Sequence, residues 1–230
     1  MKQLLFDAGP LISLTTNNLL WLVPKLKNTY AGEFAIVESV RRELVEHPLV
    51  TRKFKFEALQ VQRIIQDRVL TVVQDPKTLS RAKSLLDTAN RIFRVRKQPL
   101  QIVQLGEMET ISAALLQGAD AVVCDERITR TLIEAPHKLR ELYERRLHEK
   151  VDMDENALHD FSQQVKGIKI IRSVELVMIA YEKGLLDSFL VNVPNARKEL
   201  LESLLWGVKL HGAAISEDEI AELVRMELKR

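Results

Sequence analysis

Short apolar runs separated by longer amphipathic stretches recur along this chain, a pattern typical of alternating strands and helices. The first run is Leu4–Phe6, and a similar one covers Ala121–Cys124. Both are too short for a helix and are bounded by charged or polar residues, as expected of strands buried on both faces of a parallel sheet. The alternation predicts an α/β fold with a mostly parallel central sheet.

The rest of the chain can be divided in the same way. Further strands are expected at 34–37, 70–73 and 168–171. Helices are expected from Pro10, around Val40 with Pro48 closing the helix, and at 55–69, 79–93, 107–117, 174–183, 195–206 and 216–228. In the last of these, Ser216 with Glu219 three residues later predicts a capping box.

The stretch from Arg127 to Lys166 is expected to be purely helical and includes a charge-rich helix after Pro136. We interpret about 134–166 as an inserted helical hairpin within a domain of residues 1–190. Residues 191–230 then form a helical extension packed on that domain.

Composition narrows the possible classes of protein. The chain has 230 residues, of which 46% are hydrophobic and 29% charged, as is ordinary for a globular protein. A formal net charge of +2 means that any nucleic-acid-binding surface must be local. Cys124 is the only cysteine, no signal-peptide pattern is evident, and no apolar stretch approaches the length of a bilayer span. A cytoplasmic protein without a membrane partner is therefore expected.

Acidic residues gather where the predicted strands end or where helices adjoin them. The carboxyl ends of parallel strands share one sheet edge, where ligands bind in open α/β folds. Several carboxylates meeting there would repel one another unless a cation were bound, and Mg²⁺ and Mn²⁺ prefer such oxygen ligands. The acids of this predicted cleft are Asp7, Glu43, Glu107, Glu109, Asp125 and Glu126.

Each acid taken alone has an ordinary structural explanation. Asp7 could be a helix N-cap, and Glu107 and Glu109 occupy a first helical turn, where the helix dipole favours acids. Glu43 lies in the segment VRREL, where it could pair with a neighbouring arginine. The metal-site hypothesis therefore depends on the combination of acids.

In the segment FDAGPLISL a short strand ends in an aspartate that is followed by a small residue, and this resembles the opening motif of the PIN-domain nuclease family. IVESVRREL resembles its second acidic motif, and LGEMETISAALLQGADAVVCDERITRTL resembles a prokaryotic subgroup with a Gly-Glu pair at the helix start. The segment SVELVMIAYEKGLLD resembles the last strand–helix unit of that subgroup. The tail from Pro194 through ISEDEIAELV resembles its final two helices. Residues 51–104 match only loosely.

The resemblance implies a doubly wound α/β/α sandwich and an endoribonuclease that uses Mg²⁺ or Mn²⁺ to cleave single-stranded RNA, often as the toxin of a toxin–antitoxin pair. A homodimer and a cognate antitoxin protein are implied as partners. The implied catalytic and metal-binding residues are Asp7, Glu43, Glu109 and Asp125, with Glu107 and Glu126 as rivals. Positions two apart on a helix point in nearly opposite directions, so one of Glu107 and Glu109 is expected to reach the metal.

The chain also departs from the family pattern. Many relatives have a hydroxyl residue where this chain has Ala8, so one hydrogen bond to a metal ligand is expected to be missing. A PIN-fold module that binds nucleic acid or protein with weak or no turnover is the alternative function.

Arg127 and Arg130 follow the acidic edge and could hold phosphates of a single strand. An ordinary surface helix in which Arg130 pairs with Glu134 is the alternative for these two arginines.

Overall fold

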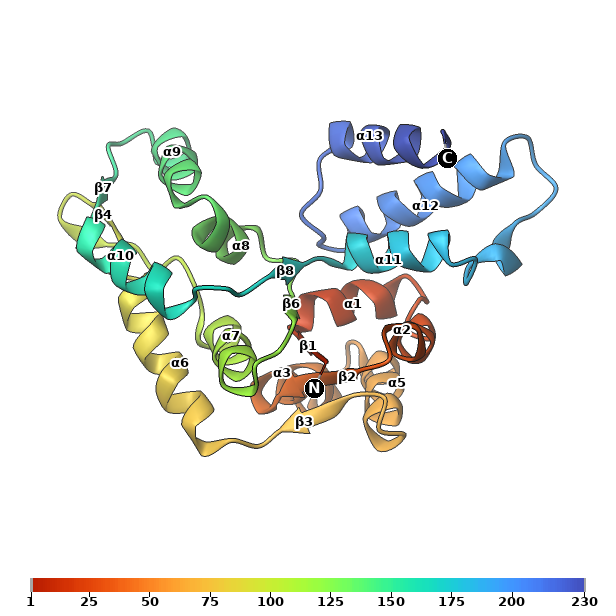
Figure 1. The fold of residues 1–230 in the computed structure, drawn as a ribbon, viewed down its shortest axis with the longest axis horizontal. Coiled ribbons are helices and arrows are strands. Elements are labelled where there is room, and N and C mark those ends of the chain that lie inside the picture. The colour runs from red at the N-terminus through yellow and green to blue at the C-terminus, as the bar shows by residue number, and fades with distance from the viewer. Residues whose placement is uncertain (1, 230) are drawn as a thin grey trace.

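A five-stranded, all-parallel sheet forms the centre of the protein (Figure 1), which is described for residues 2–229 by a computed structural model. The strand order β3-β2-β1-β6-β8 places β1 in the middle, with Leu4 level with Phe34 on one side and Ala121 on the other. This confirms the predicted α/β class and parallel sheet. The strands are β1 (Gln3–Phe6), β2 (Glu33–Val37), β3 (Thr71–Val73), β6 (Ala121–Val123) and β8 (Ile170–Ile171).

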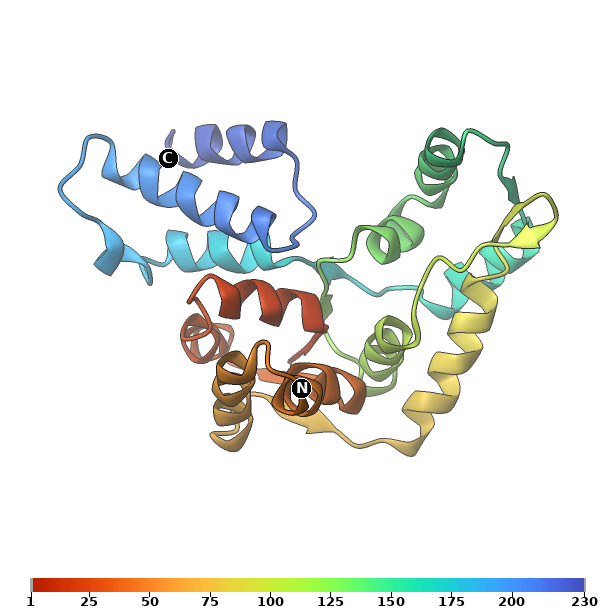
Figure 2. The same cartoon turned by 180° about the vertical axis from the view of Figure 1, so that it is seen from behind.

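Helices cover both faces of this sheet, as the two opposite views show (Figures 1 and 2). α7 (Leu105–Gln117) lies on one face, and α1 (Ala8–Thr16) and α11 (Ser173–Glu182) lie on the other. The three inner strands β1, β2 and β6 are buried almost completely, because both faces are covered, whereas the edge strands β3 and β8 are half-buried. Flanking helices near β2 and β3 are α2 (Leu22–Tyr30) and α5 (Lys55–Gln66).

The helix after β2 is longer than expected and changes pitch. It consists of α3 (Glu38–Arg41), a π-helical turn at Arg42–Glu46 and α4 (His47–Val50), so the prediction that Pro48 closes it was wrong. Proline lacks an N–H and its ring clashes with the carbonyl four residues earlier in a regular α-helix. The π turn widens the backbone just before Pro48, with the His47 amide donating to the Arg42 carbonyl. The helix therefore accommodates the proline and continues.

A second hydrophobic core lies beside the main one and was not anticipated. It gathers buried side chains such as Leu85, Phe93, Met108, Leu139 and Phe161. The elements around it include α6 (Pro76–Ala89), α8 (Arg127–Glu134), α9 (Pro136–Leu147) and α10 (Glu155–Gln164). The interpretation of about 134–166 as a helical hairpin therefore misses that this segment shares a core with α6 and α7.

Three short strands border this second core. They are β4 (Phe93–Val95), β5 (Gln98–Pro99) and β7 (Asp152–Met153), which pair antiparallel. The expectation that Arg127–Lys166 is purely helical was thus wrong at β7, and the helix expected up to Phe93 ends at Ala89. A strand of two residues has no hydrophobic alternation to detect, and β7 forms only because β4 supplies its hydrogen-bonding partner.

The C-terminal helices complete the main core. After a 3-10 turn at Asp187–Phe189 come α12 (Ala196–Leu210) and α13 (Glu217–Glu227). Their buried Leu205 and Val224 belong to the same cluster as the sheet. These helices are connected to α11 by polar contacts as well as by apolar ones.

Arg172 makes that polar connection, directly before α11. Its guanidinium contacts the carboxylates of Glu175 and Glu219 and donates to the Ala214 carbonyl at 3.0 Å. Ser216 caps α13 as predicted, with the Glu219 amide 3.1 Å from its hydroxyl. The Glu219 side chain also binds Arg172, and both this guanidinium and the backbone amide of Ser216 at the helix start lower the pKa of Glu219.

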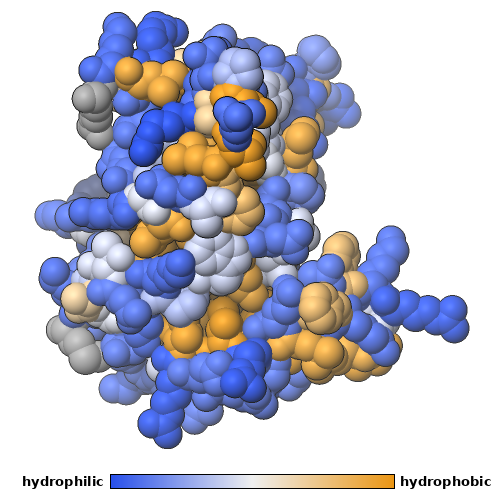
Figure 3. Space-filling model, turned by 90° about the vertical axis from the view of Figure 1, so that its right-hand side faces the viewer, coloured by the Kyte–Doolittle hydropathy of each residue, from blue (hydrophilic) through white to orange (hydrophobic). Residues whose placement is uncertain are grey.

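The surface is predominantly polar with separate apolar patches, seen in orange in Figure 3. Phe56 and Leu59 on α5 are more than half exposed. Across the described residues, no helix has both the length and the apolar character needed to cross a membrane.

Candidate functional site

A pocket of about 510 Å³ opens at the carboxyl ends of β1 and β6. These two strands lie where the strand order changes direction, since β2 and β3 follow on one side of β1 whereas β6 and β8 follow on the other. Such switch points leave a crevice in which open α/β sheets bind ligands. All six acids proposed from the sequence line this pocket: Asp7, Glu43, Glu107, Glu109, Asp125 and Glu126.

Asp7 follows β1 and contacts β6 and the residue after it. Its amide donates to the Val123 carbonyl at 2.9 Å, and the Cys124 thiol lies 3.7 Å from its Oδ2. Burial raises the pKa of Asp7 to about 6, and the negative charges of Glu43 and Asp125 act in the same direction. Asp7 occupies the N-cap position of α1 but makes no side-chain capping hydrogen bond, so capping does not explain it.

Asp125 is the least exposed acid of the pocket, with 5% of its surface exposed. Its Oδ1 accepts a hydrogen bond of 2.8 Å from the Ser173 amide at the start of α11. Its Oδ2 is buried and has no hydrogen-bond partner among the described residues. Burial raises the pKa of Asp125, although the contacts with Ser173 oppose this. A buried carboxylate oxygen without a partner is unfavourable unless something binds it.

Glu126 differs from its neighbour in exposure and in role. It is exposed, and its Oε1 accepts from the Ile128 amide at 3.1 Å, so that it caps α8. Its charge nevertheless acts on Glu107 across the pocket. Asp125 is therefore the buried member of this doublet, and Glu126 the solvated one.

Glu107 and Glu109 both line the pocket, but they have different surroundings. The Thr129 hydroxyl donates to Glu107 Oε2, and burial raises the pKa of Glu107 to about 7, with the charges of Asp7 and Glu126 adding to the effect. Glu109 makes no hydrogen bond or ion pair with any residue in 2–229. The structure thus couples Glu107, the residue treated as the rival, to the other acids.

Glu43 lies in the π-helical turn. The arginines beside it are engaged elsewhere, because Arg41 pairs with Glu38 at 2.7 Å and with Glu46 at 2.5 Å, while Arg42 contacts Glu38 at 3.3 Å. The surface ion pair considered for Glu43 is therefore not formed. A π turn inside an α-helix is a local irregularity that is frequent at functional sites.

Ser39 is a pocket residue that sequence reasoning missed. Its hydroxyl lies in the lining, is buried and lacks a hydrogen-bond partner within the described part of the chain. The signal was available, since Ser39 follows β2 at the same sheet edge as the acids. Gln104 and Gly212 also line the pocket, but nothing in their local sequence indicated this.

The two arginines proposed for phosphate binding do not line the pocket. Arg127 begins α8 and is exposed, and no ion pair engages it within residues 2–229. Arg130 lies near α13, because its charge lowers the pKa of Glu219. No ion pair joins Arg130 to Glu134 in the described structure, so the alternative pairing is not formed either.

The pocket carboxylates are the kind of oxygen ligand that a hard divalent cation prefers, but their side chains are not arranged to bind one as they stand. Carboxylates with raised pKa values and the unpartnered Asp125 Oδ2 would each gain from a nearby positive charge. As the side chains stand, no group of three or more His, Cys, Asp or Glu residues in the described structure is arranged so that it could hold a metal ion. Binding an ion would therefore require some of these side chains to change rotamer.

The chain was compared with protein families, curated proteins and solved structures. No family model matches the chain, and no curated protein or solved structure matches it either.

Proposed function

We propose that the acidic pocket binds Mg²⁺ or Mn²⁺ and that the protein is a PIN-like endoribonuclease acting on single-stranded RNA. The observation that carries this proposal is the concentration of six acids from separate elements in one pocket at the switch point of the sheet. The resemblance of FDAGPLISL and the segment 105–132 to PIN-domain nucleases supports RNA cleavage as the reaction.

In this proposal Asp7, Glu43 and Asp125 hold the metal, and Glu107 or Glu109 completes the set. A bound divalent ion would polarise the phosphodiester and lower the pKa of a water. Asp125 is already oriented by the Ser173 amide, so only its Oδ2 is available to a ligand. Glu107, with a pKa of about 7, has the proton affinity that suits a group exchanging a proton near neutral pH.

A non-catalytic binding module is the second candidate, and two observations favour it. Ala8 removes a hydroxyl from the first acidic motif, and no complete set of ligands is preformed in residues 2–229. In this second proposal the same fold binds nucleic acid or protein without turnover.

The two candidates are separated by measuring metal binding and cleavage together. For the enzyme, Mn²⁺ raises the melting temperature of the wild type, this gain is lost in Asp7→Asn, and a labelled single-stranded RNA is cut only by the wild type with metal. Glu222→Gln is the matched control, since it removes the same charge from an exposed position on α13. Stabilisation by Mn²⁺ without cleavage of varied RNAs supports the binding module. If Mn²⁺ does not stabilise the protein, the metal site itself is refuted.

The remaining expectations depend on the resemblance alone. We propose a homodimer, a cognate antitoxin protein and a cytoplasmic location. Sedimentation analysis of the purified chain tests the first, and co-purification with the product of an adjacent reading frame tests the second.

A further inference from the structure

A second pocket, of about 410 Å³, adjoins the acidic one. The two share Ile12 and Glu43 in their linings, so they are neighbours along α1 and the π-helical turn. Leu44, Pro48 and Val61 supply apolar walls. The volume lies in the range of pockets that hold small organic groups.

Basic side chains surround this second pocket. His47, Arg52 and Lys53 belong to its lining, and both Arg52 and Lys53 are exposed. None of the three forms an ion pair within residues 2–229. Glu43 and Glu57 also line the pocket, and they can accept hydrogen bonds from amino groups. The pocket therefore combines apolar walls with two exposed cations, Arg52 and Lys53, which form no ion pair with its two carboxylates or with any other described residue.

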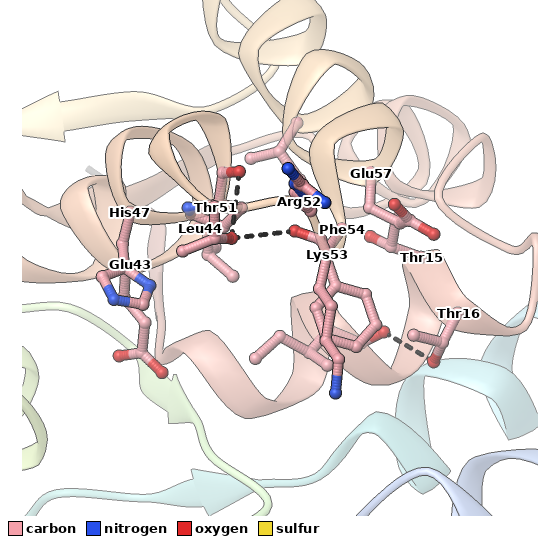
Figure 4. A pocket seen from close by; sticks show the side chains of 13 residues that line it. Thr15, Thr16, Glu43, Leu44, His47, Thr51, Arg52, Lys53, Phe54 and Glu57 are labelled. Carbon is pink, nitrogen blue, oxygen red and sulfur yellow. Dashed lines mark hydrogen bonds between the residues drawn. The ribbon is translucent and has the colours of Figure 1, made fainter.

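Phe54 contributes an aromatic ring in an unusual backbone conformation. It precedes α5 with φ 60° and ψ 23°, a left-handed conformation that bulky residues rarely adopt. Its side chain is 57% exposed, so burial of the ring in a core does not account for the strain. Strained backbone of this kind tends to occur at binding sites. In Figure 4, Lys53 and Phe54 lie between Glu43 and His47 on one side of the pocket and Thr16 on the other.

We infer that this pocket is a nucleobase subsite, in which a base of a single-stranded RNA stacks on Phe54 while Arg52 and Lys53 contact the adjoining phosphates. Stacking on aromatic rings combined with basic contacts to the backbone is how single strands are bound without sequence readout. When a base is held here, the adjoining RNA backbone lies next to Glu43, at the edge of the acidic pocket. This inference deepens the proposed function, on which it rests for the choice of RNA as ligand.

The test is metal-free binding of fluorescent oligoribonucleotides, measured by polarisation in EDTA. Phe54→Ala is expected to raise the Kd about tenfold or more, as loss of one stacked base does. Phe56→Ala is the matched control, because Phe56 is an exposed phenylalanine two residues away that lines a different pocket. An oligonucleotide with abasic positions is expected to bind the wild type as weakly as the complete one binds Phe54→Ala.

One further variant controls for folding. Phe54→Gly relieves the left-handed strain, so it is expected to lose binding without a lower melting temperature.

A separate variant tests the phosphate contacts. Arg52→Ala together with Lys53→Ala is expected to weaken binding and to reduce its dependence on salt.

The inference is overturned if Phe54→Ala binds as the wild type does, if Phe56→Ala has an equal effect, or if abasic and complete oligonucleotides bind alike. Unchanged oligonucleotide binding in Phe54→Ala would also be the result if the pocket takes a protein side chain instead of a base. Failure of the proposed nuclease looks different, because the wild type would then bind the oligonucleotide through Phe54 but leave it uncut after addition of Mn²⁺.

Discussion

The Ser173 amide donates a 2.8 Å hydrogen bond to Asp125 Oδ1, and this fixes the carboxylate so that its buried Oδ2 has no partner among the described residues. The first helical turn of α11 thus orients an acid that follows β6. Because Arg172, one residue earlier, contacts Glu219, the C-terminal helices are connected to the same point. The pocket is therefore supported from a part of the chain distant in sequence.

Asp125→Asn tests the importance of the charge at this position. The amide oxygen can still accept from Ser173, so the fold is expected to be retained, with a melting temperature at pH 7.5 equal to or above that of the wild type because burial disfavours the charged carboxylate. Stabilisation by Mn²⁺ is expected to disappear. Differential scanning fluorimetry with and without Mn²⁺ measures both effects, and undiminished stabilisation by Mn²⁺ would count against Asp125 as a ligand.

Stability is expected to fall as pH rises through the range in which Asp7 and Glu107 lose their protons. Their pKa values rise from 3.8 to about 6 and from 4.5 to about 7, so the unfolded chain releases these protons before the folded protein does. Glu107→Gln should flatten this slope and raise stability at pH 8 on the order of 2 kcal/mol. Urea denaturation at several pH values between 5 and 8 measures the free energy of unfolding of the wild type and the variant. Glu109→Gln is the matched control, and an identical gain there would contradict the assignment.

Pro48→Ala is expected to weaken metal binding at a distance. Alanine restores an amide donor and removes the ring, so the helix can return to α-helical pitch and turn Glu43 away from the pocket. The expected result is a weaker Mn²⁺ effect with a melting temperature at least as high. Pro76→Ala serves for comparison, since Pro76 stands in the first turn of α6, outside the pocket. If both variants respond to Mn²⁺ like the wild type, the π turn has no role in the site.

Arg127 and Arg130 are expected to contribute unequally to RNA binding. Arg127 is exposed and unpaired within residues 2–229, whereas Arg130 lies in the field of Glu219. Arg127→Ala should weaken binding of single-stranded RNA and reduce the slope of log K against log salt by about 0.7, as for one lost phosphate contact. Arg130→Ala should change the slope less. Titrations at several salt concentrations decide this, and a larger effect at Arg130 would reverse the assignment.

Local patterns predicted much of the main sheet and some helix ends. The continuous apolar runs before Asp7 and Asp125 identified β1 and β6, because strands buried on both faces need apolar residues at every position. Gly118 ended α7 as expected, in a left-handed conformation that glycine adopts at low cost. The acids at the strand ends then followed from the topology of parallel sheets.

Other features depended on contacts that the sequence does not reveal. β7 exists because β4 pairs with it across a long separation, and the second core joins α6 to α10 in the same way. The choice between Glu107 and Glu109 could not be made from helical periodicity, because it depends on which face of α7 packs toward Thr129 and Asp7.

The sequence by itself determined the α/β class, a mostly parallel sheet of short apolar strands and the acids that follow these strands, since apolar runs and the residues next to them are local features. Only the tertiary structure decided that Glu219 binds Arg172 as well as belonging to the start of its own helix, and that Asp125 has one carboxylate oxygen without a partner among the described residues. The physical reason is that hydrogen bonds and desolvation depend on which distant groups the fold brings within a few ångströms of each other.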